Sequence, residues 1–315
     1  MKILVTGCAG FIGSNLCDAL LDLGFDVIGV DNFNDYYNPK IKENNLIYAQ
    51  TYKSFKLYRS DILDFKNISN IFKKEKPQYV VHLAARAGVR PSIVNPKLYA
   101  EVNVLGTVNL LKLSVDFKVK RFIFGSSSSV YGNSPNIPFS EDDLCLNIIS
   151  PYGSSKRKAE FWVESFYRSY GLSSVILRFF TVYGPRGRVD MAPFLFLRAI
   201  LEGKEIIQFG EGQTSRDYTY VTDIVEGIVK ALTCSTNLET INLGNSNPIT
   251  LLEFIKEIEI GISKAAKVKI MPKQAGDVEK TWANVVKARR ILDWQPKTYL
   301  RDGLRSYIKW LKINS

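Results

Sequence analysis

Three glycines near the N-terminus constrain the fold of this chain most strongly. Gly7, Gly10 and Gly13 recur at every third position, directly after the apolar segment Lys2–Thr6 and around the start of the helix-periodic segment Phe11–Leu23. Glycines at this spacing allow a tight turn, close approach of the backbone to a pyrophosphate, and packing of the helix on the strand. The helix N-terminus then faces the phosphates. The pattern predicts a dinucleotide-binding turn.

A carboxylate, Asp31, ends the second apolar segment. An acidic side chain about twenty residues beyond the glycines is placed to bind ribose hydroxyls. Because a carboxylate there would repel a 2′-phosphate, the sequence favours NAD over NADP. Asp61 and Ile62 follow the third apolar segment and could flank the adenine, although a polar turn at a strand end has the same pattern.

The first half of the chain alternates apolar runs with helix-periodic segments, which is typical of a parallel α/β sheet. The predicted strands are Lys2–Thr6, Asp26–Val30, Phe55–Arg59, Tyr79–Leu83, Arg121–Gly125 and Ser174–Phe179. The predicted helices are Phe11–Leu23, Lys66–Lys74, Lys97–Asp116 and Tyr152–Tyr170. We therefore predict the α/β class, with a Rossmann-type doubly wound parallel sheet forming an NAD-binding domain over residues 1–180.

After Phe180 the periodicity is weaker. A loop rich in glycine and proline covers Tyr183–Arg188, and shorter elements follow it. We expect helices near Asp223–Leu232, Leu251–Ile260 and Arg301–Leu311, and a strand near Thr240–Leu243. These elements predict a smaller C-terminal α/β substrate-binding lobe over residues 181–315, while segments near 215–245 could return to the first domain.

Histidine and cysteine are too sparse for ordinary metal or nucleophilic chemistry. The single histidine, His82, lies inside an apolar run, and the four cysteines, Cys8, Cys17, Cys145 and Cys234, are far apart. A zinc site needs three or four such ligands together. We predict no metal site, with His82 as a hydrogen-bonded core residue and the thiols as small buried hydrophobes.

Charge and hydropathy restrict the partners and the location. The net charge is +11, but the lysines are spread along the chain and no nucleic-acid-binding module is present. A basic surface equally suits an anionic small molecule, so no nucleic-acid partner is expected. No apolar stretch is long enough to span a membrane, and the turn at Gly7 leaves no room for a secretory signal. We therefore expect a cytoplasmic protein.

A tyrosine and a lysine, Tyr152 and Lys156, are four residues apart and share one helical face. A neighbouring ammonium and the positive nicotinamide ring both favour the phenolate, so the pair suits a general base. Four serines, Ser126–Ser129, end the fifth predicted strand at the edge where α/β proteins bind ligands. Each pattern alone is common, and the serines could form only a polar junction.

Together these motifs resemble the extended short-chain dehydrogenase/reductase family, in its branch of nucleotide-sugar epimerases and dehydratases. The resemblance extends from Ile3 to about Leu311. Its motifs are the glycine turn, Leu83-Ala84-Ala85, the serine run before Val130-Tyr131-Gly132, the Tyr152 and Lys156 pair, and Arg216-Asp217-Tyr218-Thr219-Tyr220-Val221 followed by Asp223.

The resemblance implies roles for particular residues. Ser127, four positions before Tyr131, would be the catalytic hydroxyl, Tyr152 the base and Lys156 its partner. The implied NAD-binding residues are Gly7, Gly10, Phe11, Ile12, Gly13, Asp31, Asn32, Asp61, Ile62, Leu83, Ala84, Ala85, Asn103, Tyr152, Lys156 and Phe179. The implied UDP-sugar-binding residues are Arg90, Ser127, Ser128, Thr181, Arg188, Gln208, Arg216 and Asp277. Arg216 would meet the diphosphate and Asp277 the uridine ribose. The family also forms homodimers through two long helices, here near 97–116 and 152–170.

The resemblance implies oxidation of the sugar at C4, after which three outcomes are open. Dehydratases of this family carry Asp-Glu in the two positions after the catalytic hydroxyl, and decarboxylases commonly carry a glutamate in the second. This chain has Ser128 and Ser129 there, neither a strong acid nor base. The remaining outcome is return of the hydride to the other face of the 4-keto sugar, which is epimerisation. A non-catalytic NAD-binding protein would not need Ser127, Tyr152 and Lys156 together.

The sugar is suggested by three segments. Phe179–Ala192, Asp31–Pro39 and Ala87–Arg90 are similar to those of the UDP-glucuronate 4-epimerases, although Val189 stands where that group usually has proline. The guanidinium of Arg188 suits bidentate binding of a C6 carboxylate, and Thr181 could add a hydrogen bond. Arg188 could instead serve the loop or the diphosphate. A 4-epimerase of UDP-glucose or UDP-N-acetylglucosamine is the alternative.

Overall fold

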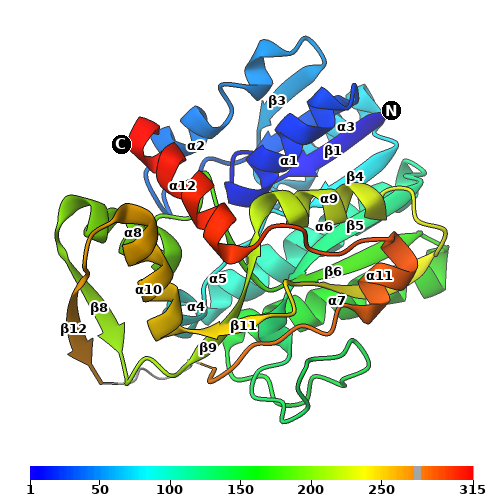
Figure 1. Cartoon of the computed structure of the whole chain (residues 1–315). Helices are drawn as coiled ribbons and strands as arrows, with labels where there is room; N and C mark the ends of the chain where they lie inside the picture. The colour runs from blue at the N-terminus through cyan, green and yellow to red at the C-terminus, as the bar shows by residue number, and fades with distance from the viewer. Residues whose placement is uncertain (273–277, 315) are drawn as a thin grey trace.

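The computed structural model of the chain describes residues 1–272 and 278–314 and shows two lobes (Figure 1). The larger lobe is built on a seven-stranded sheet with the order β3-β2-β1-β4-β5-β6-β10, in which all neighbours are parallel. Its strands are β1 (Lys2–Thr6), β2 (Asp26–Asp31), β3 (Phe55–Arg59), β4 (Tyr79–His82), β5 (Arg121–Ser127), β6 (Ser174–Phe179) and β10 (Leu238–Leu243). The predicted Rossmann-type doubly wound fold is confirmed.

The strand order reverses between β1 and β4. The chain runs outward from β1 through β2 to β3, and then crosses to β4 on the other side of β1. Loops that follow these two strands leave in opposite directions, which opens a crevice at their carboxyl ends. A ligand site is therefore expected at that edge of the sheet.

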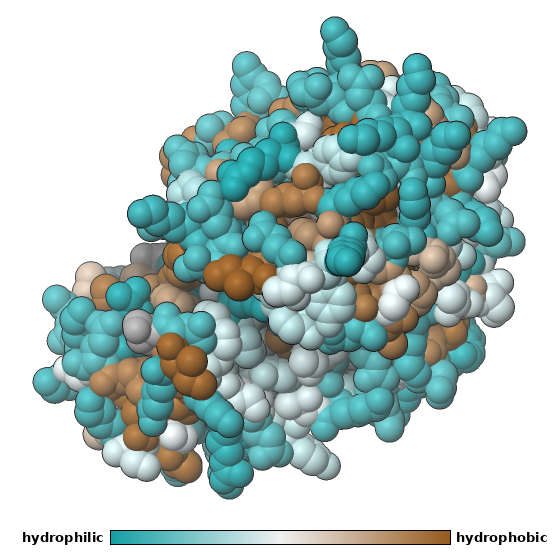
Figure 2. Space-filling view, turned by 90° about the horizontal axis from the view of Figure 1, so that it is seen from above, coloured by the Kyte–Doolittle hydropathy of each residue, from teal (hydrophilic) through white to brown (hydrophobic). Residues whose placement is uncertain are grey.

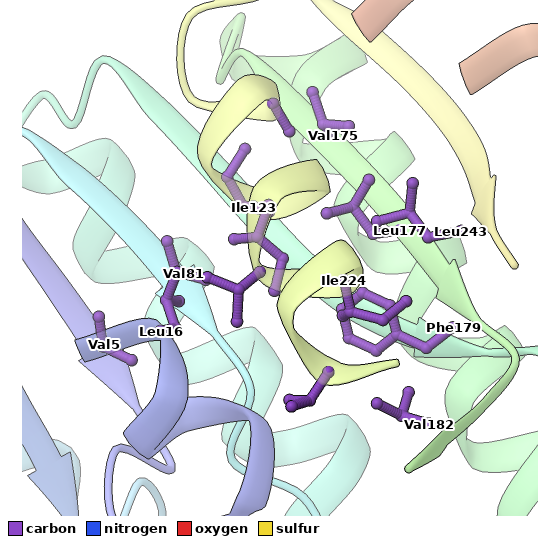
Figure 3. Close-up of a cluster of buried hydrophobic side chains, with 14 of the residues drawn as sticks. Val5, Leu16, Val81, Ile123, Val175, Leu177, Phe179, Val182, Ile224 and Leu243 are labelled. Carbon is purple, nitrogen blue, oxygen red and sulfur yellow. The ribbon is translucent and has the colours of Figure 1, made fainter. Parts of the chain in front are cut away.

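Helices cover both faces of the sheet. One face carries α1 (Phe11–Asp22), α9 (Val221–Ala231) and α11 (Val286–Leu292), and the other carries α3 (Phe65–Glu75), α6 (Gly106–Asp116) and α7 (Pro151–Tyr170). Figure 3 shows Ile224 of α9 against Leu177 and Phe179 of β6. Ile176 and Arg178, which alternate with them along β6, face the other way: Ile176 joins the core on the α7 side and Arg178 binds Glu160 of α7. Alternation along a strand buried on both faces explains why the predicted strands are so apolar.

The helix expected over Lys97–Asp116 is interrupted. Between α5 (Pro96–Ala100) and α6 the chain forms a π-helical turn, η2 (Glu101–Leu105), with Asn103 at its centre. The Asn103 side chain accepts the N–H of Arg86 at 2.7 Å and donates to the Arg86 carbonyl at 2.9 Å. The extra residue in this turn lets Asn103 reach the loop that follows β4, as π-bulges often do near functional sites. Hydrophobic periodicity does not reveal such a bulge.

The smaller lobe contains two short sheets with a shared apolar core. Its strands are β7 (Thr181–Tyr183), β8 (Glu205–Phe209), β9 (Ser215–Tyr220), β11 (Pro248–Thr250) and β12 (Lys267–Met271). Its helices are α8 (Ala192–Glu202), α10 (Leu251–Ile262) and α12 (Leu300–Asn314). The start of α10 is fixed by a capping box, in which Thr250 and Glu253 bind each other's backbone N–H. The strands of this lobe were not predicted, because they are short and partly polar.

The chain passes between the lobes more than once. After β9 it forms α9 and β10, and β10 pairs with β6 so that Leu238 lies opposite Ser174. Short elements complete the structure: α2 (Pro39–Asn45), η1 (Ala49–Thr51), α4 (Val89–Val94) and η3 (Ser128–Val130). Figure 1 shows α12, in red, returning across the molecule beside α10.

The surface is mainly polar. Figure 2 shows charged and polar side chains over most of one face, with apolar side chains visible between them on the larger lobe and on the smaller lobe. That lobe exposes Ile207, Val268 and Ile270 along the β8–β12 pair. No helix within the described part of the chain is long and apolar enough to cross a membrane.

Candidate active site

A cleft of about 650 Å³ opens at the carboxyl ends of β1 and β4, where the strand order reverses. It combines the glycine turn, the end of β2, the loop after β4, the serine run and the start of α7 with residues that follow β6. Predicted site residues that line it are Gly7, Gly10, Phe11, Ile12, Gly13, Asp31, Asn32, Asp61, Ile62, Leu83, Ala84, Ala85, Arg90, Ser127, Ser128, Tyr152, Lys156, Phe179, Thr181 and Arg188. Residues up to 181 positions apart in the chain thus meet in one cavity.

The glycine turn is too tight for any larger residue at two positions. Gly7 has φ +69°, and a Cβ atom there would lie 2.8 Å from the backbone nitrogen of Ala84. A Cβ at Gly13 would overlap the carbonyl oxygen of Gly7. The backbone is therefore bare on the side where α1 begins, which is the cradle that a pyrophosphate needs.

Asp31 closes the other side of this cradle. Its Oδ2 accepts the N–H of Ala9 at 3.2 Å and its Oδ1 accepts the N–H of Phe33 at 2.8 Å. Burial raises the pKa of Asp31, while these two hydrogen bonds and the charge of Lys42 oppose the rise. Nearby, the amide of Asn32 donates to Asp61 Oδ2 at 2.7 Å. Asp31 thus both braces the glycine turn and presents a carboxylate where an adenosine ribose would lie. These residues fit NAD.

Lys156 lies beneath the cleft, near the start of α7. The helix is capped by Ser150, whose hydroxyl accepts the N–H of Gly153 at 3.0 Å. Lys156 is only 3% exposed, and its ammonium donates to the Gly125 carbonyl at 2.8 Å. Burial lowers the pKa of Lys156 to about 7, although the charge of Glu160 opposes the fall. Keeping the positive charge on this buried lysine therefore costs considerable solvation free energy.

Tyr152 is one helical turn closer to the cleft. Its ring meets that of Tyr99 edge to face at 6.1 Å, and its N–H donates to Ser92 Oγ at 3.0 Å. Burial raises the pKa of the Tyr152 phenol, while a hydrogen bond with Ser127 and the positive charge of Arg188 oppose the rise. Ser127, Tyr152 and Arg188 therefore converge, and a bound cation would further favour the phenolate.

Ser127 is the last residue of β5, two residues beyond the predicted end of that strand. Its hydroxyl accepts the N–H of Ser129 at 3.2 Å and lies 3.2 Å from the Ser129 hydroxyl. This turn leads from β5 into η3. It directs the Ser127 hydroxyl to the same cavity as Tyr152.

A buried ion pair, not predicted from the sequence, supports this region from behind. Glu160 accepts from Arg178 at 3.0 and 2.8 Å and from the Ser126 hydroxyl at 2.5 Å. Both charged residues are buried. The available signals were a charge inside an apolar strand, at Arg178, and an acid one turn after Lys156.

Arg188 lines the cleft but is already engaged. Its Nε donates to Asp190 Oδ1 at 3.0 Å and its Nη2 to Asp190 Oδ2 at 2.6 Å. The Tyr36 hydroxyl donates to Asp190 Oδ2 at 3.1 Å and accepts from Arg188 Nη2 at 3.3 Å. Tyr36 and Asp190 also line the cleft, and the sequence analysis named neither as a site residue. No local pattern links two residues that are 154 positions apart.

Three predicted site residues within the described part of the chain are outside the lining of the cleft. Asn103 is buried behind it, where it binds the Arg86 backbone and donates to Ser155 Oγ at 2.9 Å. Gln208 of β8 donates to the Gly210 carbonyl at 3.0 Å, and Arg216 of β9 donates to the Ser215 carbonyl at 2.9 Å. Asp277 lies outside the described residues.

One contact suggests how the smaller lobe approaches the cleft. Arg90, on α4 of the larger lobe, lies 4.8 Å from the ring centre of Phe209 at the end of β8. This cation–π contact joins the two lobes beside the cavity. It brings the β8 segment, including Gln208, toward the end of the cleft that Arg90 lines.

His82 is confirmed as a core residue. Its ring nitrogens lie 2.7 Å from Thr6 Oγ1 and 3.0 Å from Thr107 Oγ1, and burial lowers its pKa well below the usual range. Three cysteines are buried, whereas Cys234 is partly exposed. Over residues 1–272 and 278–314, no group of three or more His, Cys, Asp or Glu side chains is arranged to hold a metal ion.

The comparisons with known proteins identify the family. The family model described as GDP-mannose 4,6 dehydratase matches residues 4–307. A UDP-glucuronate 4-epimerase of Thermodesulfobacterium geofontis is 42% identical over 313 residues, covering 99% of this chain and 96% of the relative. The chain therefore belongs to the extended short-chain dehydrogenase/reductase family, in its branch of nucleotide-sugar epimerases and dehydratases, as the sequence motifs predicted.

Two solved structures share the whole fold. A UDP-glucuronic acid 4-epimerase of Bacillus cereus, in complex with UDP-glucuronic acid and NAD, is 36% identical with a TM-score of 0.95, and each chain is covered fully. A UDP-glucose 4-epimerase of Thermotoga maritima, with UDP-glucose, is 34% identical with a TM-score of 0.92, covering 100% of this chain and 99% of that one. These relatives are named for different sugars, so the choice of sugar depends on the cleft.

Proposed function

We propose that this protein is an NAD-dependent UDP-sugar 4-epimerase that interconverts UDP-glucuronate and UDP-galacturonate. The observation that carries the choice of sugar is the position of Arg188, whose guanidinium lines the cleft together with Tyr152 and Thr181. The two solved relatives with bound UDP-sugars, one of them also with NAD, support the reaction class.

The cofactor part of the proposal rests on the glycine turn and Asp31. The turn gives a bare backbone for the pyrophosphate, and Asp31 gives a carboxylate for the ribose hydroxyls. NAD held by these residues would supply hydride transfer from and back to the sugar C4. The carboxylate at Asp31 favours NAD over NADP, because a 2′-phosphate would be repelled.

Tyr152 acts as the general base and acid. It removes the proton of the C4 hydroxyl, while Ser127 holds the same oxygen by a hydrogen bond. Lys156 stabilises the phenolate by its charge from one turn along α7. After the 4-keto sugar has turned its other face, Tyr152 returns the proton to the new hydroxyl.

The residues beside Ser127 disfavour dehydration of the sugar. Elimination of water requires an acid and a base near the sugar C5 and C6, and Ser128 and Ser129 supply only hydroxyls. With glucuronate as the substrate, the protein must also prevent loss of the carboxylate as CO₂. The 4-keto intermediate is a β-keto acid, which loses CO₂ when its C5–C6 bond aligns with the π system of the ketone. Arg188 and Thr181 hold the carboxylate away from that alignment.

Replacement of Arg188 by alanine tests the choice of sugar. Loss of a charge-assisted contact costs about 1.5–3 kcal/mol, so KM for UDP-glucuronate should rise by about 10- to 100-fold, with a much smaller change for UDP-glucose. Arg186→Ala is the matched control, since Arg186 lies in the same loop but pairs with Asp18 of α1 at 2.7 Å. Equal effects of Arg188→Ala on both sugars would contradict the assignment.

A second candidate, a UDP-glucose 4-epimerase, is favoured by one observation. Asp190 already neutralises the charge of Arg188 through two hydrogen bonds, so the cleft does not present a full positive charge at this point. A neutral hexose would then be accepted as well as a uronate. The same substrate comparison distinguishes the two candidates.

The family expectation of a homodimer fits the exposed face of α7. Phe161 is 61% exposed and Trp162 39%, and Leu105 on the neighbouring helix is 52% exposed. We infer that these side chains are buried against a second copy of the chain, as apolar patches of this kind commonly are. Sedimentation equilibrium of the purified protein would give the mass of a dimer, and a monomer would refute the inference.

A further inference from the structure

Asp190 and Tyr36 make a second layer around Arg188 that the reaction scheme above does not use. Tyr36 belongs to the loop after β2 of the larger lobe, and Asp190 to the loop after β7. Their side chains meet across the cleft at 3.1 Å. Both contact the same guanidinium nitrogen, Nη2 of Arg188.

The hydrogen bonds use only one edge of the guanidinium. Nε and Nη2 donate to Asp190, and Nη2 also approaches the Tyr36 hydroxyl and, at 3.5 Å, the Ala87 carbonyl. Nη1 donates to none of the residues that the structure describes. A planar fork held at one edge has a fixed orientation, because rotation about its bonds would break two short hydrogen bonds.

Asp190 and Arg188 are both charged at neutral pH. Burial raises the pKa of Asp190, but the hydrogen bonds and charge of Arg188 and the hydroxyl of Tyr36 outweigh it, so the pKa lies below the usual range. Asp190 is 38% exposed on its side chain and Arg188 17%, so the carboxylate lies nearer solvent and the guanidinium nearer the cleft. The pair is therefore close to neutral overall, and attraction for a second carboxylate is weakened.

We propose that Asp190 is a positioning residue that orients Arg188 for the sugar carboxylate, and so determines whether the 4-keto intermediate keeps or loses CO₂. Asp190 and Tyr36 hold one edge of the guanidinium, and Nη1 is left to bind one carboxylate oxygen. This contact between Nη1 and the carboxylate mainly fixes the orientation of the carboxylate, and adds less to its binding free energy. This inference rests on the proposed function, since only a uronate has a carboxylate to lose.

The side reaction that this arrangement prevents is simple. The C5–C6 bond breaks, its electron pair passes into the C4 ketone as an enolate, and CO₂ leaves. A proton from water then adds to C5, which gives a UDP-4-ketopentose. No oxidant or reductant is consumed in this step, so orientation of the carboxylate is the main barrier that the protein can impose.

Asp190→Asn tests the proposal through product partition. The variant keeps the size of the side chain but accepts at one oxygen only, so Arg188 loses its fixed edge. With UDP-glucuronate, we expect the fraction of pentose products and released CO₂ to rise by about tenfold or more, since one lost charge-assisted hydrogen bond is worth at least that factor. KM for UDP-glucuronate should change by less than in Arg188→Ala, because Arg188 itself is still present.

Further variants distinguish a lost orientation of Arg188 from a general disturbance of the site. Tyr36→Phe removes the hydroxyl that bridges Asp190 and Arg188 and should raise CO₂ release in the same direction, by a smaller factor. Asp190→Glu should restore part of the epimerase product. Asp18→Asn breaks the ion pair of Arg186 in the same loop without contacting Arg188 and should leave the partition unchanged.

The products are measured by proton NMR of the UDP-sugars together with trapped CO₂. An unchanged partition in Asp190→Asn, with or without a rise in KM, would overturn the positioning role, and so would an equal rise in Asp18→Asn. If the wild-type protein does not convert UDP-glucuronate at all, the proposed function itself is wrong. The two failures are therefore distinguishable.

Discussion

Replacement of Lys156 by methionine should stabilise the protein while it abolishes turnover. The ammonium is buried and its pKa is lowered from 10.5 to about 7. One pKa unit corresponds to about 1.4 kcal/mol, so holding this charge in the folded state costs about 5 kcal/mol at low pH. Methionine keeps the length of the side chain without the charge, but leaves the Gly125 carbonyl without its donor, which costs about 1–3 kcal/mol.

The sign of the pH dependence follows from the lowered pKa. Between about pH 7 and 10.5 the unfolded chain binds a proton at Lys156 that the folded protein does not bind, so wild-type stability rises with pH through this window. The penalty is complete below pH 7 and falls to about 2 kcal/mol at pH 9. Lys156→Met lacks this dependence. We therefore expect it to exceed the wild type by about 2–4 kcal/mol at pH 6 and to match it at pH 9.

Thermal unfolding of nucleotide-free protein at pH 6 and pH 9 measures the difference. Two to four kcal/mol corresponds to roughly 4–10 °C in Tm for a chain of this size. Lys158→Met, at an exposed position on the same helix, is the control and should show no such change with pH. If Lys156→Met is less stable than the wild type at pH 6, or if its advantage grows with pH, then the buried charge is not the destabilising feature that we infer.

Two further substitutions test the supports of the site. Gly13→Ala places a Cβ against the Gly7 carbonyl oxygen, so it should destabilise the protein by about 1–3 kcal/mol and weaken NAD binding by about tenfold or more, measured by titration calorimetry; unchanged affinity would refute the pyrophosphate cradle. Glu160→Gln leaves the buried Arg178 without its counter-charge and should lower stability by about 3–5 kcal/mol, seen as a fall in Tm; a change within experimental error would show that the pair is dispensable.

The sequence predicted the framework of the larger lobe well, for a physical reason. β1 and β6 begin and end at the predicted residues, because strands covered on both faces are largely apolar runs. β3 also matches its predicted bounds, although it is an edge strand whose residues are only partly buried or exposed. The glycine turn and Asp31 were also predictable, since their chemistry depends on local spacing. The π-helical turn at Asn103 was not, because it depends on a contact with the loop after β4.

In the candidate site, too, residues in local motifs were predictable, whereas contacts between distant segments were not. Ser127, Tyr152 and Lys156 could be assigned by motif, and all three line the cleft. Tyr36 could not be linked to Arg188 and Asp190 in advance, because its contacts with them join loops that follow different strands. The sequence suggested an arginine for the carboxylate, whereas the structure adds the residues that fix its direction.

The most direct test of the central claim is a proton NMR time course of the purified protein with UDP-glucuronate, alongside UDP-glucose and UDP-N-acetylglucosamine as separate substrates. The account predicts that UDP-glucuronate is converted to an equilibrium mixture with UDP-galacturonate, faster than either neutral sugar reacts and with little pentose product. Conversion of a neutral sugar alone, with UDP-glucuronate unchanged, would contradict it.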